Sequence, residues 1–176
     1  GRAIRFNESK VRSMGRTASG VRGITLVGSD EVIGMVCAQD FSRTILVVSE
    51  NGYGKRTFLN DPENNEPIYR VTNRGGKGVK GQKMTKEDDV TPYMQIADTH
   101  DTILFFTDKG RVFSSRVFDL PANQSRNSRG TPVHNIVALE QREKVNAILT
   151  VPEINQELES YIVMATKKGV IKTMDI

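Results

Sequence analysis

The chain has 176 residues, 37% of them hydrophobic and 26% charged, with a formal net charge of +4. These values are ordinary for a folded protein and argue against intrinsic disorder. The longest apolar runs, at 44–48 and 161–165, have the length of strands and are too short to cross a bilayer. We therefore expect a cytoplasmic protein with no membrane partner.

Hairpins recur along the chain. Around Gly52, Gly110 and Gly169, an apolar strand leads into a turn that ends in glycine and then into a strand carrying basic residues, a pattern that predicts β-hairpins. The chain also begins at such a glycine, Gly1, so the intervals between these glycines are 51, 58 and 59 residues. Self-similarity with a period of this size indicates a solenoid or a propeller.

Each hairpin leads into a glycine-rich basic stretch and then into another predicted strand pair. The strand pairs are predicted at 24–39 and 133–151, and the middle unit has its apolar residues late, near 90–97. Cys37 lies in the first of these segments, where we expect a buried, inert thiol. The sequence thus predicts an all-β, propeller-like array of about three four-stranded blades, with units 1–51, 52–109 and 110–168 and the start of a further hairpin at 169–176.

Charge separates along these units. Segments 1–22, 52–86, 109–130 and 167–172 hold 22 of the 25 Lys and Arg residues but 5 of the 21 Asp and Glu residues. One charged strand alone would be read as a solvated face, but a bias repeated in every unit predicts a continuous basic belt that suits a curved polyanion. The candidate belt cations are Arg12, Arg16, Arg22, Lys55, Arg56, Arg74, Lys77, Lys80, Lys109, Arg111, Arg116, Arg126, Arg129, Lys168 and Lys172.

The sharpest local motif is the stretch Arg74-Gly75-Gly76-Lys77-Gly78. Three glycines would let the backbone approach a phosphate and present N–H groups to it, while Arg and Lys supply charge. The stretches 15–20 and 125–130 keep an arginine and a final glycine. The spacing fits neither a Walker loop nor a dinucleotide fingerprint, so we expect no nucleotide and no other cofactor.

Other residues with possible site chemistry carry little signal. His100 and His134 have no carboxylate or cysteine at ligand spacing, and the acidic run 87–89 lacks the alternating oxygen ligands of a calcium loop. The tyrosines have no catalytic context. We therefore expect no metal site and no catalytic residue, and a chain that is not an enzyme on its own.

The stretches 1–24, 45–57, 69–80, 99–112 and 161–173 resemble the C-terminal domain of the DNA gyrase A subunit, and Arg74 to Gly78 is similar to the core of its signature box. The resemblance implies a β-pinwheel, a propeller-like ring whose neighbouring blades exchange a strand and whose basic edge wraps double-stranded DNA without sequence specificity. It also implies two partners in ATP-dependent negative supercoiling, the gyrase B subunit together with the rest of the gyrase A subunit, and a non-catalytic role for this region.

The chain departs from the family pattern in two ways. Thr72 and Asn73 replace the glutamine and the basic residue that open the signature box. Residues 1 to about 80 look like later blades and the rest like blades near the start of the domain, an order that a lineage with rearranged blades, a truncation or an engineered junction near Lys80-Gly81 would each explain. About three periods predict an incomplete or rearranged ring, closed end to end through 160–166 or by pairing of two chains as a homo-oligomer.

Two other functions stay open on the sequence. One is a topoisomerase IV type of C-terminal domain that steers the choice of DNA substrate. The other is a propeller that binds proteins, for which we would expect more than 6% aromatic residues and less charge on the rim.

Overall fold

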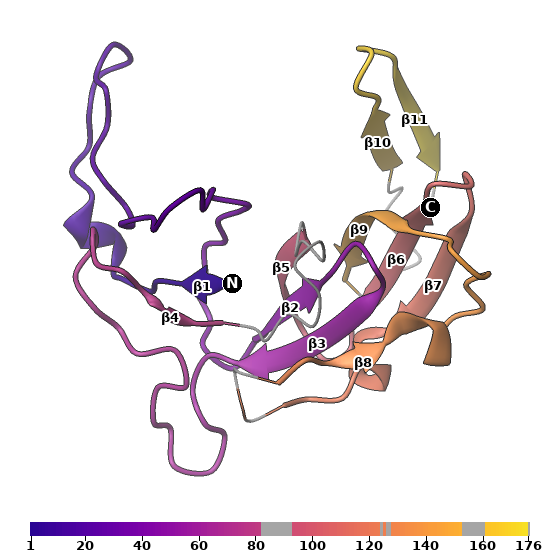
Figure 1. Ribbon diagram of the computed structural model, residues 1–176, viewed down its shortest axis with the longest axis horizontal. Helices are drawn as coiled ribbons and strands as arrows, with labels where there is room; N and C mark the ends of the chain where they lie inside the picture. The colour runs from indigo at the N-terminus through magenta and orange to yellow at the C-terminus, as the bar shows by residue number, and fades with distance from the viewer. Residues whose placement is uncertain (82–92, 124, 126–127, 153–160, 176) are drawn as a thin grey trace.

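The computed structural model describes residues 1–81, 93–123, 125, 128–152 and 161–175, and the chain is all-β, as predicted (Figure 1). Its helical segments within these ranges are three 3-10 turns, so none is long and apolar enough to span a bilayer. The elements in chain order are β1 (Arg2–Ala3), η1 (Glu8–Lys10), β2 (Thr44–Val48), β3 (Tyr53–Phe58), β4 (Val79–Lys80), β5 (Tyr93–Ala97), β6 (Thr102–Thr107), β7 (Val112–Arg116), η2 (Val117–Asp119), β8 (Thr131–Pro132), η3 (Val133–Asn135), β9 (Val145–Val151), β10 (Tyr161–Ala165) and β11 (Ile171–Asp175).

The three predicted hairpins are confirmed. Antiparallel ladders join β2 to β3, β6 to β7 and β10 to β11. Each turn ends at a glycine with positive φ, +75° at Gly52, +73° at Gly110 and +81° at Gly169. A residue with a side chain would be strained in this conformation, which explains why the turn glycine recurs in every unit.

The described strands form four sheets, whose strands interleave along the chain. The described residues form a four-stranded sheet of order β5-β2-β3-β8, a three-stranded sheet β7-β6-β9 and the pairs β1-β4 and β10-β11. Figure 1 shows β1 and β4 at one end of the molecule, the two larger sheets beside them, and the β10–β11 hairpin projecting near the other end. Within the described ranges the blades form no closed ring.

Successive units are linked by short strands that cross from one unit to the next. β4 follows the glycine-rich stretch of the second unit and pairs with β1 of the first, and β8 of the third unit pairs with β3 of the second. The side chain of Gln95 on β5 adds a link, because its amide oxygen accepts from the Thr150 N–H of β9 at 3.0 Å. Each unit therefore depends on its neighbour for part of its sheet.

The core lies on both sides of β2, whose five residues are all buried. Leu46 and Val48 face a cluster that includes Ile103 and Phe105 of β6. The opposite face of β2 belongs to a second cluster with Leu59 and Tyr69. Burial on two faces explains the uninterrupted apolar run, since a strand with one solvated face would alternate.

The predicted strand pair at 24–39 is wrong. The structure has no strand in this segment, and Cys37, expected to be buried, is exposed. Apolar side chains of the segment are also exposed, among them Leu26, Val32 and Met35. A strand needs a neighbour to satisfy its backbone, and among the described residues no strand lies along 24–39. The segment 133–151 forms one strand, β9, preceded by the turn η3, instead of two strands.

Candidate nucleic-acid interface

The glycine-rich stretch 74–78 packs against the unit that precedes it. The Gly75 N–H donates to the carbonyl oxygen of Gly23 at 2.6 Å, and the Thr25 N–H donates to the carbonyl oxygen of Gly76 at 2.8 Å. The hydroxyl of Thr25 also donates to the carbonyl of Gly75 at 2.6 Å. These bonds fix the stretch on residues 23–25 through the backbone of both segments.

Two glycines make the same close contact in successive units. Gly78 has a φ of +66°, and a Cβ added there would lie 2.6 Å from the carbonyl oxygen of Ala3. Gly130 has a φ of +92°, and its added Cβ would lie 2.5 Å from the carbonyl oxygen of Gly54. Ala3 and Gly54 each stand two residues after a turn glycine. We call this arrangement the inter-unit contact, and at both places it requires glycine.

Arg74 joins two points of the first unit. Its Nε donates to the carbonyl oxygen of Lys10 at 2.9 Å, and its Nη1 donates to the carbonyl oxygen of Arg22 at 3.0 Å. The loop between Lys10 and Arg22 carries the exposed side chains of Arg12 and Arg16. Arg74 therefore holds the two ends of a cationic loop together.

This geometry corrects part of the sequence interpretation of the motif. The N–H of Gly75 and two donors of Arg74 already bind protein carbonyls, so they are not available to a phosphate. Gly76 and Lys77 are exposed beside them. The backbone of the stretch and Arg74 thus hold neighbouring segments of the first unit in place, and Lys77 adds an exposed positive charge.

Most of the predicted belt cations are exposed. The exposed ones are Arg12, Arg16, Arg22, Lys77, Lys80, Lys109, Arg116, Arg129, Lys168 and Lys172, while Arg74 and Arg111 are half-buried together with Gly75 and Gly78. Arg126 lies outside the described residues, as does the acidic run 87–89.

Two of the predicted belt cations are buried, which corrects their assignment. Lys55 is fully buried and Arg56 is 7% exposed. The Lys55 Nζ donates to the carbonyl oxygen of Gly81 at 2.8 Å, and the Arg56 Nε donates to that of Leu120 at 3.1 Å. These bonds satisfy the two buried cations, as the burial of a charged group requires, and they tie β3 to Gly81 and to the end of η2 in the third unit. Neither side chain can contact a polyanion from its position.

Burial lowers the pKa of Lys55 from 10.5 to about 8. Between these values the unfolded chain keeps a proton that the folded chain has lost, so the free energy of unfolding should rise with pH over this window, by up to about 3 kcal/mol. Urea unfolding followed from pH 8 to 10.5 measures this rise. In the Lys55→Met variant the rise in the free energy of unfolding should vanish. An equal rise in this variant would show that Lys55 is not the source of the pH dependence.

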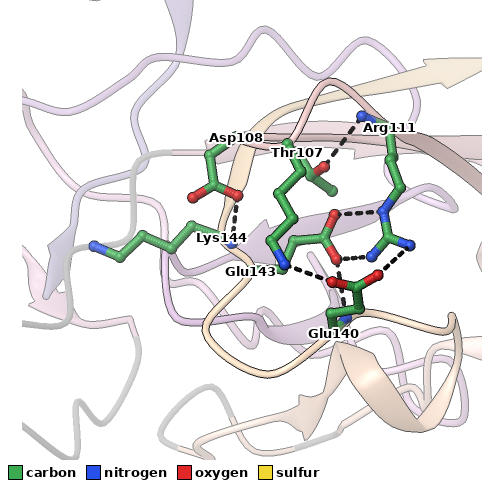
Figure 2. A network of polar contacts seen from close by, with 7 residues as sticks. Thr107, Asp108, Arg111, Glu140, Glu143 and Lys144 are labelled. Atoms are coloured by element: carbon green, nitrogen blue, oxygen red, sulfur yellow. Dashed lines mark hydrogen bonds and ion pairs between the residues drawn. The ribbon is translucent and has the colours of Figure 1, made fainter.

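Acidic residues partly neutralise the cations at the β6–β7 turn (Figure 2). The Lys109 Nζ lies 2.5 Å from a Glu140 oxygen, and the Arg111 Nη1 lies 3.0 Å from the other Glu140 oxygen. The Arg111 guanidinium also donates to both carboxylate oxygens of Glu143, and this bond holds the pKa of Glu143 at about 2. Because Glu140 and Glu143 lie beside Lys109 and Arg111, the net positive charge of this turn is smaller than the charge of its two cations alone.

The third unit places two further cations on its surface. The Arg116 Nη1 donates to the carbonyl oxygen of His100 at 3.1 Å. The guanidinium carbon of Arg129 lies 3.8 Å from the centroid of the Tyr53 ring, a cation–π contact with the preceding unit. Arg129 immediately precedes Gly130, so this cation sits beside the inter-unit contact, as Lys77 does beside Gly78.

A structural role shared by Arg5 and Arg56 was missed in the sequence. The Arg5 Nη1 donates to Asn60 Oδ1 at 2.9 Å and to the carbonyl oxygens of Leu59 and Tyr69 at 3.2 and 3.1 Å. Arg5 and Arg56 each stand four residues after a turn glycine and each reach into the next unit. The sequence did contain a signal for this role, because the two arginines occupy the same position after the turn glycine in successive units.

Comparison with known proteins gives a family and several relatives that this chain resembles. The sequence model of the family described as DNA gyrase C-terminal domain, beta-propeller, matches residues 1–39, 43–61, 69–91, 101–152 and 160–176. The DNA gyrase A subunit of Staphylococcus aureus (strain NCTC 8325 / PS 47) is 38% identical over 128 residues, which are 73% of this chain and 13% of that protein. The DNA gyrase A subunit of Mycobacterium bovis (strain BCG / Pasteur 1173P2) is 36% identical over 128 residues, 73% of this chain and 14% of that protein.

Two solved structures share the fold. The crystal structure of the C-terminal domain of DNA topoisomerase IV superposes with a TM-score of 0.72 at 23% identity, covering 86% of this chain and 44% of that one. The structure of a DNA gyrase A C-terminal domain gives a TM-score of 0.68 at 22% identity, covering 85% of this chain and 47% of that one. The chain thus spans less than half of these domains and about one seventh of the curated relatives.

Proposed function

The chain belongs to the DNA gyrase C-terminal domain family, and from this premise we propose that it binds double-stranded DNA without sequence preference and wraps it along its exposed cations. In this role it handles DNA for a topoisomerase and contributes no catalytic residue. Its proposed partners in ATP-dependent negative supercoiling are the gyrase B subunit, the rest of the gyrase A subunit, and DNA. The repeat units 1–51, 52–109 and 110–168 are the proposed building blocks of the wrapping surface.

One observation carries the proposal: exposed cations accompany the inter-unit contact in two successive units. Lys77 and Lys80 flank Gly78, and Arg129 precedes Gly130. The inter-unit contact fixes each unit on its neighbour, so a polyanion that touches both cation groups must follow the turn from one unit to the next. DNA is stiff, and bending a short site costs on the order of 1–6 kcal/mol, which contacts on several units together can offset.

The loop held by Arg74 extends this surface. Arg12 and Arg16 project from the loop, and Arg22 lies at its base. Together with Lys77 they place four cations around one structured stretch. Lysine and arginine side chains that neutralise phosphates release counterions, which is the main source of affinity in binding without sequence preference.

The stretch Arg74 to Gly78 also favours the gyrase role over the topoisomerase IV role. In the family the signature box is usually degenerate in topoisomerase IV, whereas this chain keeps arginine, lysine and three glycines at its core. We therefore propose wrapping as the main activity, with steering of substrate choice as the second candidate.

Ligation of nicked circular DNA in the presence of the chain tests this function. We expect a linking difference of one sign at low salt, because DNA that follows successive units must writhe. Each neutralised phosphate should contribute about −0.9 to the slope of log affinity on log salt, so binding and linking difference should both fall steeply between about 50 and 200 mM. Affinity that stays flat with salt would exclude a phosphate-binding surface, and tight binding with no linking difference would exclude wrapping.

A further inference from the structure

The carboxylate of Glu140 lies between two cations of the β6–β7 turn. One of its oxygens is 2.5 Å from the Lys109 Nζ, and the other is 3.0 Å from the Arg111 Nη1. A phosphate group of DNA also presents anionic oxygens to lysine and arginine donors, and arginine binds carboxylate and phosphate with the same fork of N–H groups. Lys109 and Arg111 therefore form a site for one anionic group, which Glu140 of the same chain fills.

The second carboxylate at this turn, that of Glu143, has a different role. Figure 2 shows the Arg111 guanidinium in contact with both Glu140 and Glu143. Glu143 is buried and accepts from the Arg111 Nε at 3.0 Å and from the Glu140 N–H at 2.9 Å. Removing this carboxylate would leave buried donors without a partner. Glu143 therefore fixes the guanidinium in place, with the Nη1 group directed at Glu140.

The Glu140 carboxylate, in contrast, can be exchanged. Its side chain is 56% exposed, and its partners Lys109 and Arg111 are 44% and 37% exposed. Exposed ion pairs contribute little to stability because water and salt compete with them. Asn51 has the position of Lys109 in the second hairpin, and it is exposed although β8 of the third unit pairs with that hairpin. A phosphate can therefore reach this site by replacing Glu140.

The cations beside the stretch 74–78 have no such competitor. Lys77 and Lys80 are exposed, and neither forms an ion pair with a carboxylate in the part of the chain that the structure describes. DNA thus meets free cations there and occupied cations at the β6–β7 turn. A duplex already held at the free cations raises the local concentration of phosphate at the turn, as a first contact does in any multivalent binding.

We propose that Glu140 competes with DNA phosphate for Lys109 and Arg111, so that the β6–β7 turn is the last contact to form on the wrapping surface and the first to be lost as salt rises. This inference rests on the proposed DNA binding of the chain. The carboxylate limits how far the duplex is held along the surface, because every phosphate bound at the turn must displace it. Glu140 thus regulates the length of the wrapped DNA without contacting it.

Glu140→Gln tests the competition in the binding and ligation assays on DNA. Glutamine keeps the size and the backbone N–H of Glu140 but lacks the negative charge, so the free energy of unfolding in urea should stay unchanged. DNA affinity at low salt should rise by about three- to tenfold, since two exposed ion pairs no longer compete with phosphate. The slope of log affinity on log salt should steepen by about 0.9 for each phosphate gained. The linking difference should persist to higher salt.

Glu63→Gln supplies the matched control, because it removes the same charge from an exposed loop of the second unit. It should change neither the affinity nor the linking difference by more than about twofold. Wild-type affinity that does not depend on salt would refute the proposed function and this inference with it. A wild type that binds and wraps DNA, together with equal behaviour of Glu140→Gln and Glu63→Gln, would refute this inference alone.

A double-mutant cycle with Lys109→Ala separates local competition from long-range repulsion. While Glu140 occupies Lys109, the alanine variant should lower DNA affinity by less than about twofold. In the Glu140→Gln background the same substitution should remove most of the gained affinity, because the freed lysine is then a phosphate contact. Equal effects of Lys109→Ala in both backgrounds would mean that Glu140 acts on DNA only as a distant negative charge, and would overturn the proposal.

A zero-length carbodiimide crosslinker gives the direct readout, because it couples a carboxylate to an amine in contact with it. In the free chain it should join Glu140 to Lys109 and Glu50 to Lys144, whose Nζ and Oε1 atoms are 2.8 Å apart. Saturating duplex DNA without terminal phosphates should reduce the first crosslink several-fold relative to the second, as measured by mass spectrometry of the joined peptides. An unchanged ratio of the two crosslinks on DNA would show that Glu140 is not displaced, and would overturn the proposal.

Discussion

Replacing Arg74 and Lys77 together by alanine should abolish the linking difference trapped in nicked circles while lowering simple DNA affinity only modestly. Lys77 is exposed and can neutralise a phosphate, whereas Arg74 already donates to the carbonyls of Lys10 and Arg22. The salt slope should therefore fall by about one phosphate instead of two. Folding should persist, because the two lost hydrogen bonds of Arg74 are solvent-exposed and a typical hydrogen bond contributes about 0.5–1.5 kcal/mol.

Arg74→Lys separates the two roles of this arginine. Lysine keeps the charge but lacks the planar fork that reaches two carbonyls at once. If Arg74 acts by positioning the loop with Arg12 and Arg16, the linking difference should fall in Arg74→Lys although the net charge is unchanged. Arg43 and Arg142, exposed outside the basic segments, give the matched double-alanine control. Wrapping that survives the loss of Arg74 and Lys77, or falls equally in the control, would contradict a special role for the stretch 74–78.

Gly130→Ala should destabilise the fold far more than Gly20→Ala. Both positions have positive φ, +92° and +79°, so alanine adds about 1–2 kcal/mol of backbone strain at each. At Gly130 the new Cβ would also lie 2.5 Å from the carbonyl oxygen of Gly54, which forces β3 and β8 apart, while at Gly20 it meets nothing. We expect a loss above about 4 kcal/mol, or failure to fold, in Gly130→Ala.

Urea unfolding followed by circular dichroism measures both free energies of unfolding. Gly78→Ala, whose Cβ would lie 2.6 Å from the carbonyl oxygen of Ala3, should behave like Gly130→Ala. Equal losses at Gly20 and Gly130 would mean that backbone strain alone decides the effect and that the inter-unit contact contributes nothing.

The hairpins could be predicted from the sequence because their signals are local. A β-branched run, a turn and a glycine that needs positive φ stand within a few residues of one another at Gly52, Gly110 and Gly169. The segment 24–39 carries an equally apolar pattern but forms no strand, since strand formation depends on a neighbour far away in sequence. Exposure of Cys37 follows from the same missing neighbour.

The candidate site shows the same division between local and distant causes. Exposure of Lys77 and Lys80 agrees with reading basic residues as surface cations. Lys55 and Arg56 look identical to them in sequence, yet their partners are the carbonyls of Gly81 and Leu120, far along the chain. Composition and spacing within one strand contain no information on such partners, whereas alignment of Arg56 with Arg5 across units would have indicated them.

The inter-unit contact also bears on how such a surface can change in evolution. At Gly78 and Gly130 the spacing between neighbouring units is set by backbone atoms that approach without any side chain between them. Substitution of surrounding side chains therefore leaves the angle between units nearly constant. On the proposed wrapping surface, a change of surface cations would alter how strongly a polyanion is held, while the curvature of its path would stay the same.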